Sequence, residues 1–437
     1  MVKKFLRGFR RKPLGGFRQG VYRNTMGKKI IQVTYTQKIS DERLLDLSKE
    51  SASVYNKALR IFWKKKNQNV FLSKFSLQKE MSSDYSRGLL HSDSYIASLQ
   101  QFHTAVICWI RASKEYLKHP EKFTGKPKPP IVEKQVNCIT FKQHAIRCKN
   151  NFLLLSLSSG NDPIKIRWNK KLGLPIYAII NWNSNFGWLI HIVVEKTIEE
   201  ASMLQKEKIL GVDLGVKRIA TVFDGNNCIT FSGKYLNSLS RLENKIQGSN
   251  QTKLEKLKKH GRQYKKIKRA ERKIRFKIRN KEKDFLNKTS RKIVNYAVKN
   301  NIGTIVFGDC ADIHEKTNCG KNNQIIQQNL EQQLRNYVTY KYESIGGITQ
   351  VIPENYTSQT CPKCGSRKKD KRIYSCSNSL CGFQYHRDGV GSINIWGLAN
   401  NVSLGNLPNV VDGLTPPIGV KYKSFQDCLP DSFAIRH

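Results

Sequence analysis

The sequence of 437 residues is short of two features, acidic side chains and long apolar runs. Asp and Glu number 33 against 77 Lys and Arg, so the formal net charge is +44. A compact fold with this charge repels itself unless a polyanion neutralises it, which makes nucleic acid the expected partner and a membrane surface the weaker alternative. The longest uninterrupted apolar stretch, Ala105 to Ile110, is far shorter than the ~20 residues that span a bilayer, so we expect no transmembrane helix.

The chain also lacks a secretory signal and a disulfide framework. Residues 1–20 are basic but contain no apolar core of the kind found in signal peptides, so we expect a flexible basic arm there. The 11 cysteines are an odd number and seven of them lie far apart, which is typical of a reduced cytosolic protein. Because 39% of the residues are apolar, the chain can still bury real cores, and its length allows about three domains.

The N-terminal part indicates one β module that is interrupted by helices. Residues 28–36 alternate like a strand, and residues of about 41–118 have helical periodicity. The GKPKPP segment at Gly125 to Pro130 forbids helix, and short strands with turns follow it. We therefore expect a helical segment inserted between the strands of a single β module.

A second pattern begins near Lys208. Three apolar strands, KILGVDLG, RIATVFDG and NCITFSG, are joined by tight turns and followed by a long helical stretch. A strand at Gly303 to Gly308, a helix from about Gln324 to Ser344 and a strand ending at Glu354 come next. This βββ-α-β-α-β order is the one that a ribonuclease-H-like fold needs, with the strands arranged 3-2-1-4-5. The carboxyl ends of strands 1, 4 and 5 are then expected to lie side by side.

Four cysteines form the strongest local motif. Cys361-x2-Cys364-x11-Cys376-x4-Cys381 has the spacing of a tetrahedral four-cysteine zinc site. His386 lies five residues after the last cysteine, and we expect it to be a neighbour rather than a ligand. A purely structural zinc is the simplest interpretation, but five basic residues between the pairs favour a loop that also contacts nucleic acid. These residues are Arg367, Lys368, Lys369, Lys371 and Arg372.

Residues Lys253 to Lys292 form a strongly basic run, with 19 Lys or Arg and four acidic residues. The usual interpretation of a charge run is a solvated helix face with ion pairs, yet four acids leave most of this positive charge unpaired. We therefore predict a helical hairpin with an apolar stripe for packing and a basic side that contacts phosphates.

Asp213 ends a strand in the sequence GVDLG and is the first candidate for a catalytic metal site. Taken alone it is a weak signal, because a similar turn opens the sugar-kinase and actin-like folds. Metal-assisted phosphodiester hydrolysis needs several hard oxygen ligands for Mg²⁺ or Mn²⁺. The further candidates are Asp309, Asp312, Glu354 and Asp388.

These residues together resemble a known family. The segments GVDLGVKRIATV, IPENYTSQTCPKCGS and HRDGVGSINIWG, with the two cysteine pairs, are similar to the TnpB proteins of bacterial insertion sequences and to their descendants, the miniature type V CRISPR effectors. The resemblance covers residues of about 28–400. It implies an RNA-guided DNA endonuclease whose guide RNA selects a double-stranded target beside a short flanking motif. It also implies a cytoplasmic, nucleoid-associated protein of a prokaryotic cell.

The resemblance implies a multidomain α/β fold with two main parts. An N-terminal β wedge module carries a helical recognition insert, and a RuvC-like, ribonuclease-H-like nuclease domain carries an inserted four-cysteine zinc module. The expected boundaries are 1–40 for the basic arm and the first part of the wedge, 41–130 for the recognition insert, 131–205 for the second part of the wedge, 206–355 for the nuclease domain with a basic helical hairpin at 235–300, 356–385 for the zinc module, 386–400 for the final nuclease helix and 401–437 for a C-terminal tail.

The chain departs from the family at the second of three expected acids. Asp213 and Asp388 match the first and the third, but Gly308 stands where the family commonly has glutamate, in IVFGDC rather than IVxED. Strand 5 is expected ~4.8 Å from strand 4, so Glu354 at its end can place a carboxylate in the same site. A relocated glutamate of this kind occurs in part of the family. Asp309 is the competitor, although its side chain should point to the opposite face from residue 308.

The expected mechanism uses two divalent ions, Mg²⁺ or Mn²⁺, in addition to the structural Zn²⁺ and the guide RNA. Asp213 bridges both ions, Glu354 and Asp388 each hold one, and the product carries a 5′ phosphate. The main alternative is a nuclease-inactive, RNA-guided repressor, which needs every basic and zinc feature but not the acids. A guide-free zinc protein that binds RNA would show no acidic cluster. A transposase that acts through its own acids is disfavoured by the resemblance.

Overall fold

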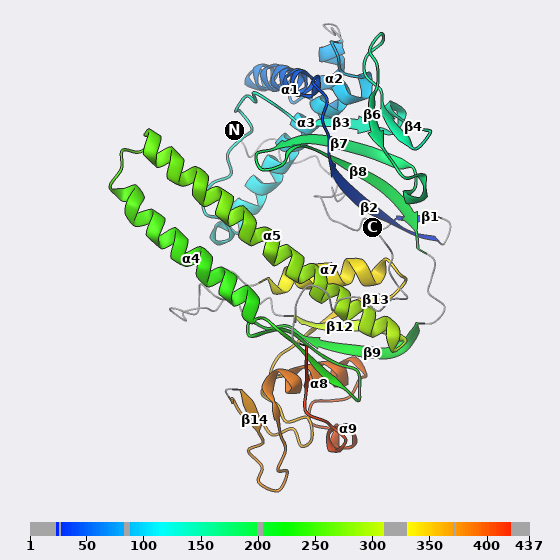
Figure 1. Cartoon of the computed structure of the whole chain (residues 1–437), viewed down its shortest axis with the longest axis vertical. Helices are drawn as coiled ribbons and strands as arrows, with labels where there is room; N and C mark the ends of the chain where they lie inside the picture. The colour runs from blue at the N-terminus through cyan, green and yellow to red at the C-terminus, as the bar shows by residue number, and fades with distance from the viewer. Residues whose placement is uncertain are drawn as a thin grey trace. The chain divides into compact units, whose positions relative to one another are not determined.

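The computed structural model describes residues 23–25, 28–82, 88–198, 204–309, 330–370 and 372–420. The chain divides into two compact units, Met1–Thr197 and Ile198–His437 (Figure 1). None of the helices in the described ranges is long and apolar enough to cross a membrane. The basic arm expected over residues 1–20 lies outside the described residues, as do Asp312, Lys371 and the tail beyond residue 420.

A five-stranded sheet in the order β1-β2-β8-β7-β3 forms the centre of the first unit. Strand β2 (Lys28–Lys38) pairs antiparallel with β8 (Gly187–Thr197), although most of the unit separates them in sequence. The remaining strands are β1 (Arg23–Thr25), β7 (Pro175–Asn183) and β3 (Ile139–Lys142). A smaller sheet contains β4 (Ile146–Lys149), β5 (Phe152–Leu155) and β6 (Ile164–Arg167). Sequence reasoning did not predict β7, although its continuous apolar run from Ile176 to Ile180 is a usable signal.

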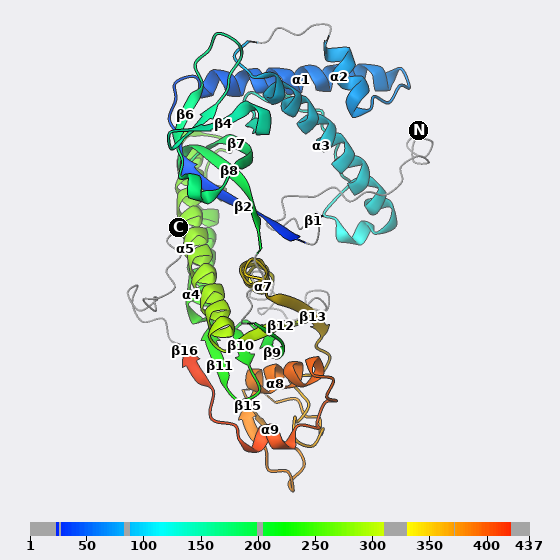
Figure 2. The same ribbon diagram turned by 90° about the vertical axis from the view of Figure 1, so that its right-hand side faces the viewer.

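Three helices lie between β2 and β3 in sequence, which confirms that a helical segment interrupts the β module. They are α1 (Leu44–Asn67), α2 (Lys74–Ser82) and α3 (Ser92–Lys118), and α1 packs against α3 (Figure 2). The indole N–H groups of Trp63 and Trp109 donate to the carbonyl oxygens of Pro130 and Pro127 at 3.0 and 3.2 Å. The proline-rich segment is therefore hydrogen-bonded to both long helices, α1 and α3. Single 3₁₀ turns occur at Pro120–Lys122, Gln143–Ala145 and Lys170–Leu172.

The second unit contains a six-stranded sheet in the order β13-β12-β9-β10-β11-β16. Strands β9 (Gln205–Asp213), β10 (Arg218–Phe223) and β11 (Cys228–Ser232) form an antiparallel meander. Strand β12 (Ile302–Asp309) runs parallel to β9, and β13 (Ile348–Pro353) runs parallel to β12. The strand order 3-2-1-4-5 predicted from the sequence is confirmed. The parallel strand β16 (Ile418–Val420) on β11 was not predicted.

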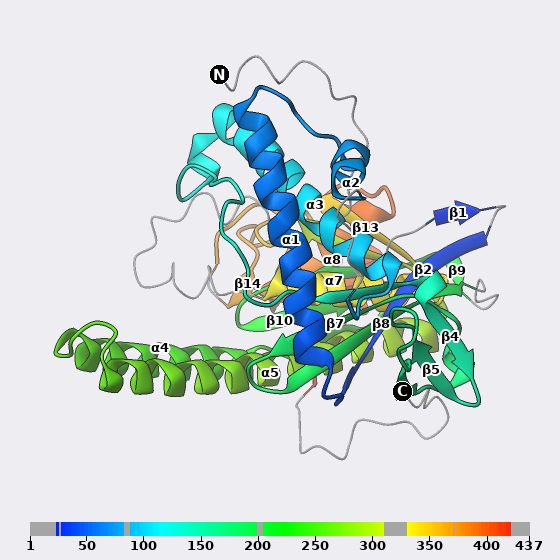
Figure 3. The ribbon, with the colours of Figure 1, turned by 90° about the horizontal axis from the view of Figure 1, so that it is seen from above.

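Helices cover both faces of this sheet. Helices α5 (Arg262–Lys299) and α7 (Glu331–Glu343) pack on one face, and α8 (Arg387–Ala399) packs on the other (Figure 2). Helix α4 (Lys234–Glu255) forms an antiparallel hairpin with α5 (Figure 3), but the basic run Lys253 to Lys292, for which a hairpin was predicted, lies mostly in α5. Helix α7 begins at Glu331, whereas the sequence predicted a start near Gln324, which lies outside the described residues. The short elements near the four cysteines are β14 (Ile373–Ser375), β15 (Gln384–His386) and α9 (Pro408–Asp412).

Candidate functional site

Strand alternation decides which side chains face α8. In β9 the buried Leu210 and Val212 join the core under α5 and α7, so Asp213 points to the opposite face. In β12 the same reasoning puts Phe307 in that core and Gly308 on the α8 face. Asp213 and Gly308 therefore share one face of the sheet, at the carboxyl ends of two neighbouring parallel strands.

The side chain of Glu354 lies over Gly308. A Cβ atom at position 308 would overlap Oε2 of Glu354 and would lie 3.0 Å from Cβ of Glu354 and 2.9 Å from Cδ1 of Ile395 on α8. Gly308 pairs with Ile352 in the parallel register of β12 and β13, so Glu354 comes just after the end of β13. The space left by the missing side chain at position 308 is thus filled by the carboxylate of Glu354.

Helix α8 brings the remaining acid to the same face. A Cβ atom on Gly391 would lie 2.6 Å from Oδ2 of Asp213, so only glycine allows the helix to pass this close to the carboxylate. Asp388 lies in the first turn of α8, three residues before Gly391, and residues three apart share a helix face. The structure therefore gathers Asp213, Glu354 and Asp388 along one side of α8.

The charges of these acids act on one another. Burial, followed by the negative charges of Glu354 and Asp388, raises the pKa of Asp213 well above its ordinary value, and the charge of Glu331 acts in the same direction. The positive charge of Arg387 opposes this shift without cancelling it. The cluster thus carries an excess of negative charge, and its hard oxygen donors fit a divalent cation such as Mg²⁺ or Mn²⁺.

Asp388 is held by an ion pair. Nη1 of Arg218, at the start of β10, donates to Oδ2 of Asp388 at 3.1 Å and also contacts the imidazole of His386. Nδ1 of His386 accepts the backbone N–H of Asp388 at 3.3 Å and so caps α8. His386 is therefore a neighbour of the acidic site, and it is not a member of the four-cysteine group, as the sequence predicted.

Asp309 points away from this cluster. Its Oδ1 atom lies 3.4 Å from Nη1 of Arg335 on α7, which covers the opposite face of the sheet. The competitor for the role of second acid is therefore separated from Asp213 by the plane of the sheet, as the alternation of side chains predicted.

Sequence reasoning missed three charged residues near the acids, namely Arg218, Arg387 and Glu331. Glu331 is buried in the first turn of α7, and its position depends on a helix start that the sequence did not fix. Arg387 is adjacent to Asp388, and its guanidinium donates to the carbonyl oxygen of Asp370 at 3.3 Å. Arg218 stands at the start of β10, the strand that pairs with β9 at Asp213. A basic residue at the start of a neighbouring strand was the one signal in the sequence that could have identified it.

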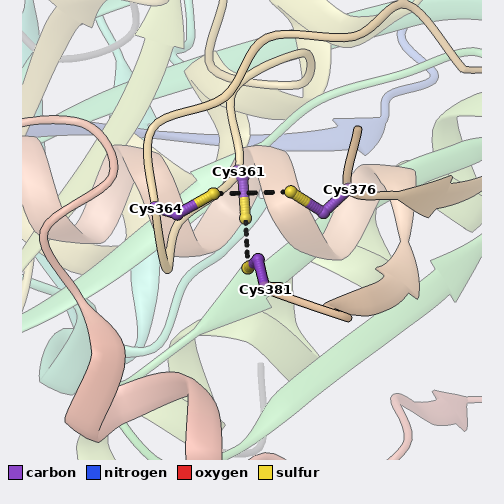
Figure 4. A group of neighbouring side chains, drawn as sticks. All are labelled: Cys361, Cys364, Cys376 and Cys381. Atoms are coloured by element: carbon purple, nitrogen blue, oxygen red, sulfur yellow. Dashed lines mark hydrogen bonds between the residues drawn. The ribbon is translucent and has the colours of Figure 1, made fainter. Parts of the chain in front are cut away.

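The four cysteines converge as their spacing predicted. Their sulfur atoms point toward a common centre (Figure 4), and all lie within 4.8 Å of one another. Sγ of Cys361 is 3.8 Å from that of Cys381, and Sγ of Cys364 is 3.4 Å from that of Cys376. A tetrahedral ion with Zn–S bonds of ~2.3 Å requires sulfur atoms ~3.8 Å apart. Within the described part of the chain, the carboxylates form no group this compact.

Local turns and hydrogen bonds prepare these thiols. The N–H of Gly365 donates to the carbonyl oxygen of Cys361 at 3.0 Å and closes the first turn, while β14 and β15 pair on either side of Cys376 and Cys381. Burial acts to raise the pKa of Cys364, but hydrogen bonds from Ser366 and the other thiols outweigh it and lower this pKa to about 6. A thiol with a lowered pKa is a ready metal ligand, whereas burial raises the pKa of Cys361 and of Cys376.

The basic hairpin presents one charged face. Arg262, Lys265, Lys266, Arg269 and Lys273 line a shallow hollow on α5. On the side of α5 that meets α4, a buried Glu271 pairs with Lys268 and Arg275, and Arg275 also pairs with Glu243 at 2.9 Å. The ion pair between Arg275 and Glu243 therefore joins the two helices, and among the described residues no acidic side chain lines the hollow on α5.

Two stretches of the chain match known family models. Residues 191–314 match the OrfB_IS605 model, described as a probable transposase, and residues 332–395 match the model of the Cas12f1-like TNB domain. Over 156 residues the chain is 29% identical to the CRISPR-associated endodeoxyribonuclease Cas12f1 of Sulfoacidibacillus thermotolerans, a match that covers 35% of this chain and 33% of the relative. The resemblance to TnpB and Cas12f1 proteins is thereby confirmed.

Two further relatives agree with this resemblance. Over 205 residues the chain is 26% identical to a TnpB-like protein of Methanocaldococcus jannaschii, covering 45% of this chain and 70% of that one. Over 207 residues it is 27% identical to the putative RNA-guided DNA endonuclease InsQ of Escherichia coli (strain K12), covering 43% and 47%. The chain thus spans about a third of the matched Cas12f1 and about half of InsQ.

The fold is similar to that of a Cas12f1 chain whose structure was solved with sgRNA and target DNA. The TM-score is 0.54 at 15% sequence identity, and the similarity covers 80% of this chain and 81% of that chain. At this level of identity the similarity concerns the fold alone.

Proposed function

We propose that the chain is an RNA-guided, divalent-metal-dependent DNA endonuclease of the TnpB type. It cuts double-stranded DNA beside a short flanking motif and is directed by a guide RNA. The observation that carries this proposal is the carboxylate of Glu354 over Gly308, on the sheet face that also bears Asp213 and that α8 covers. In a repressor that had lost its catalytic acid, binding to DNA would not require a second carboxylate in this space.

The proposal assigns a role to each part of the fold. The sheet of the second unit, with its strand order and flanking helices, is a RuvC-like nuclease domain, and residues 361–381 are its zinc module. The first unit is a wedge module with a helical recognition insert. The names of the relatives support guide RNA and target DNA as partners, and the net charge of +44 suits both.

Asp213, Glu354 and Asp388 are the residues that would hold Mg²⁺ or Mn²⁺. When bound, such ions generate a hydroxide nucleophile and stabilise the leaving 3′ oxygen. Asp213, whose pKa is raised first by burial and then by the charges of Glu354 and Asp388, would bind a cation in place of a proton. Arg218 fixes the carboxylate of Asp388 through its ion pair, and Cys361, Cys364, Cys376 and Cys381 would hold a structural Zn²⁺.

The test is to purify the chain with its co-expressed RNA, sequence that RNA and incubate the complex with a matched duplex and Mg²⁺ or Mn²⁺. Wild type should cut the duplex, whereas Asp213→Ala, Glu354→Gln and Asp388→Ala should bind it without cutting, because base pairing and basic contacts supply the affinity. Asp309→Asn is the matched control and should still cut.

Two results would overturn parts of this proposal. Cleavage that persists in Glu354→Gln but is lost in Asp309→Asn would transfer the role of second acid to Asp309. A wild-type complex that binds its target with either metal and never cuts it would make the chain a repressor.

A further inference from the structure

Tyr356 has an exposed ring on a strained backbone. Its φ is +62°, a region that costs a non-glycine residue about 1 kcal/mol or more, and 54% of the residue is exposed. Burial of the ring therefore does not compensate the strain. Because Tyr356 lies only two residues after Glu354, the strained residue stands beside the acidic site.

Hydrogen bonds lock the turn that carries this ring to α8. The carbonyl oxygen of Tyr356 accepts the N–H groups of Gln359 and Thr360 at 2.9 and 3.1 Å. Nδ2 of Asn394, buried on α8, donates to the carbonyl oxygens of Thr357 and Thr360 at 2.7 and 2.8 Å. The backbone of this turn is thus fixed to the same helix that carries Asp388.

A cation lies over the ring. The guanidinium carbon of Arg367 is 4.5 Å from the ring centroid of Tyr356, within the range of a cation–π contact. Residues 360 and 367 form an isolated antiparallel bridge, which holds Arg367 beside the turn. Arg367, Lys368 and Lys369 are all exposed, so the aromatic ring stands on a basic surface. An aromatic ring with adjacent arginine and lysine is how proteins bind single strands, because a base stacks on the ring and its phosphates meet the cations.

We propose that Tyr356 and Arg367 form a stacking platform for an unpaired base of single-stranded DNA, which holds the strand at the carboxylate site. This inference rests on the proposed nuclease function and adds the residues that position its substrate. The platform explains why an exposed tyrosine occupies a conformation that asparagine or glycine would adopt with less strain. It acts as a positioning element, since neither side chain belongs to the acidic cluster.

The strained backbone supplies a matched pair of variants. Tyr356→Phe keeps the ring, whereas Tyr356→Asn removes it and suits the positive φ, so the second variant should fold at least as stably as wild type. The probe is a single-stranded DNA with 2-aminopurine, whose fluorescence is quenched by stacking, added without Mg²⁺ or Mn²⁺ to the full chain with its co-purified RNA. Wild type, Tyr356→Phe and Glu354→Gln should all quench and bind alike. Tyr356→Asn should lose the quench and bind about 5- to 100-fold more weakly, since base stacking on an aromatic ring contributes ~1–3 kcal/mol.

Cleavage kinetics then separate this inference from the proposed function. In Tyr356→Asn, KM for single-stranded substrate should rise by a similar factor while zinc content and melting temperature stay unchanged. Normal quenching and an unchanged KM in Tyr356→Asn would overturn the platform, even if wild type cuts. Loss of quenching in that variant, together with a wild type that never cuts, would uphold the platform and overturn the nuclease.

Discussion

The four-cysteine cluster and the acidic cluster are built in opposite ways. All four cysteines lie within residues 361–381, where tight turns and a short hairpin bring their sulfur atoms within 4.8 Å. The acids Asp213, Glu354 and Asp388 come from β9, from the residue after β13 and from α8. The first cluster depends on local turn chemistry, while the second depends on strand order and on one absent side chain, at Gly308.

This difference determines which substitutions each cluster tolerates. A local cluster loses its metal when any one thiolate is removed, because the turns around residues 361–381 fix which sulfur atoms reach the centre. A cluster assembled from distant strands can exchange the strand that supplies a ligand, provided that the new carboxylate reaches the same space. Side chains at positions 308 and 354 compete for one volume, so the proposed function predicts that these positions are such exchangeable sources.

The largest expected effect comes from exchanging these two positions. Glu354→Ala should lower the cleavage rate by about 10³-fold or more, since it removes a metal ligand. Gly308→Glu alone should also impair cleavage and lower the melting temperature, because its Cβ would overlap the side chain of Glu354. The double variant Gly308→Glu/Glu354→Ala should recover cleavage, because the new glutamate enters the vacated space.

The double variant Gly308→Gln/Glu354→Ala is the control, since it fills the same space without a charge and should stay inactive. If Gly308→Glu/Glu354→Ala is folded, binds its target and remains as inactive as Glu354→Ala, the two positions are not equivalent sources of the second acid.

The same contrast explains what the sequence could predict. Cysteine spacing is read directly, and the strand order followed from the succession of apolar strands and helices, so both were anticipated. The position of Glu354 was expected from the parallel pairing of strands 4 and 5, but the overlap with position 308 appears only when side chains are placed. Glu331 was missed because its approach to the acids depends on a helix start that carries no local signal, and Arg218 was missed because its approach depends on the strand register, although it stands at the start of the neighbouring strand.

The cysteine cluster gives the second effect. Cys364→Ser should abolish zinc binding and destabilise residues 361–381 by roughly 3 kcal/mol, because structural zinc binding and local folding are coupled. Cys108→Ser is the matched control, since Cys108 is an exposed free cysteine far away in sequence and should leave the metal content unchanged. Elemental analysis and limited proteolysis measure both results. Freshly purified wild type without zinc would remove the basis of this prediction.

The basic face of α5 gives a third, smaller effect that accumulates over several residues. Replacing Lys265, Lys266, Arg269 and Lys273 with Gln should flatten the dependence of log K on log salt by up to ~3.6 on duplex DNA, at about 0.9 per lost phosphate contact. Lys268→Gln should change this slope less, because its ammonium already pairs with Glu271 at 3.0 Å. A slope that is equal in wild type and the fourfold variant on both RNA and DNA would make this face a solvated helix surface.

The smallest expected effect concerns the free energy of unfolding, which the burial and mutual repulsion of the acidic side chains lower. Burial and the charges of Glu354 and Asp388 raise the pKa of Asp213, so the folded chain binds this proton more tightly than the unfolded chain. The free energy of unfolding should therefore fall as the pH rises above the ordinary aspartate value of 3.8 toward the raised pKa. Without added Mg²⁺ or Mn²⁺ at neutral pH, Asp213→Asn should be more stable than wild type by about 1 kcal/mol, and this advantage should shrink as the pH is lowered. Mg²⁺ should raise the melting temperature of wild type more than that of Asp213→Asn, because a bound cation replaces the proton in relieving the repulsion. Equal stability of the two proteins from pH 4 to pH 8, measured by thermal unfolding without added Mg²⁺ or Mn²⁺, would mean that these carboxylates do not repel one another, and the cluster would then lack the excess charge that a divalent ion requires.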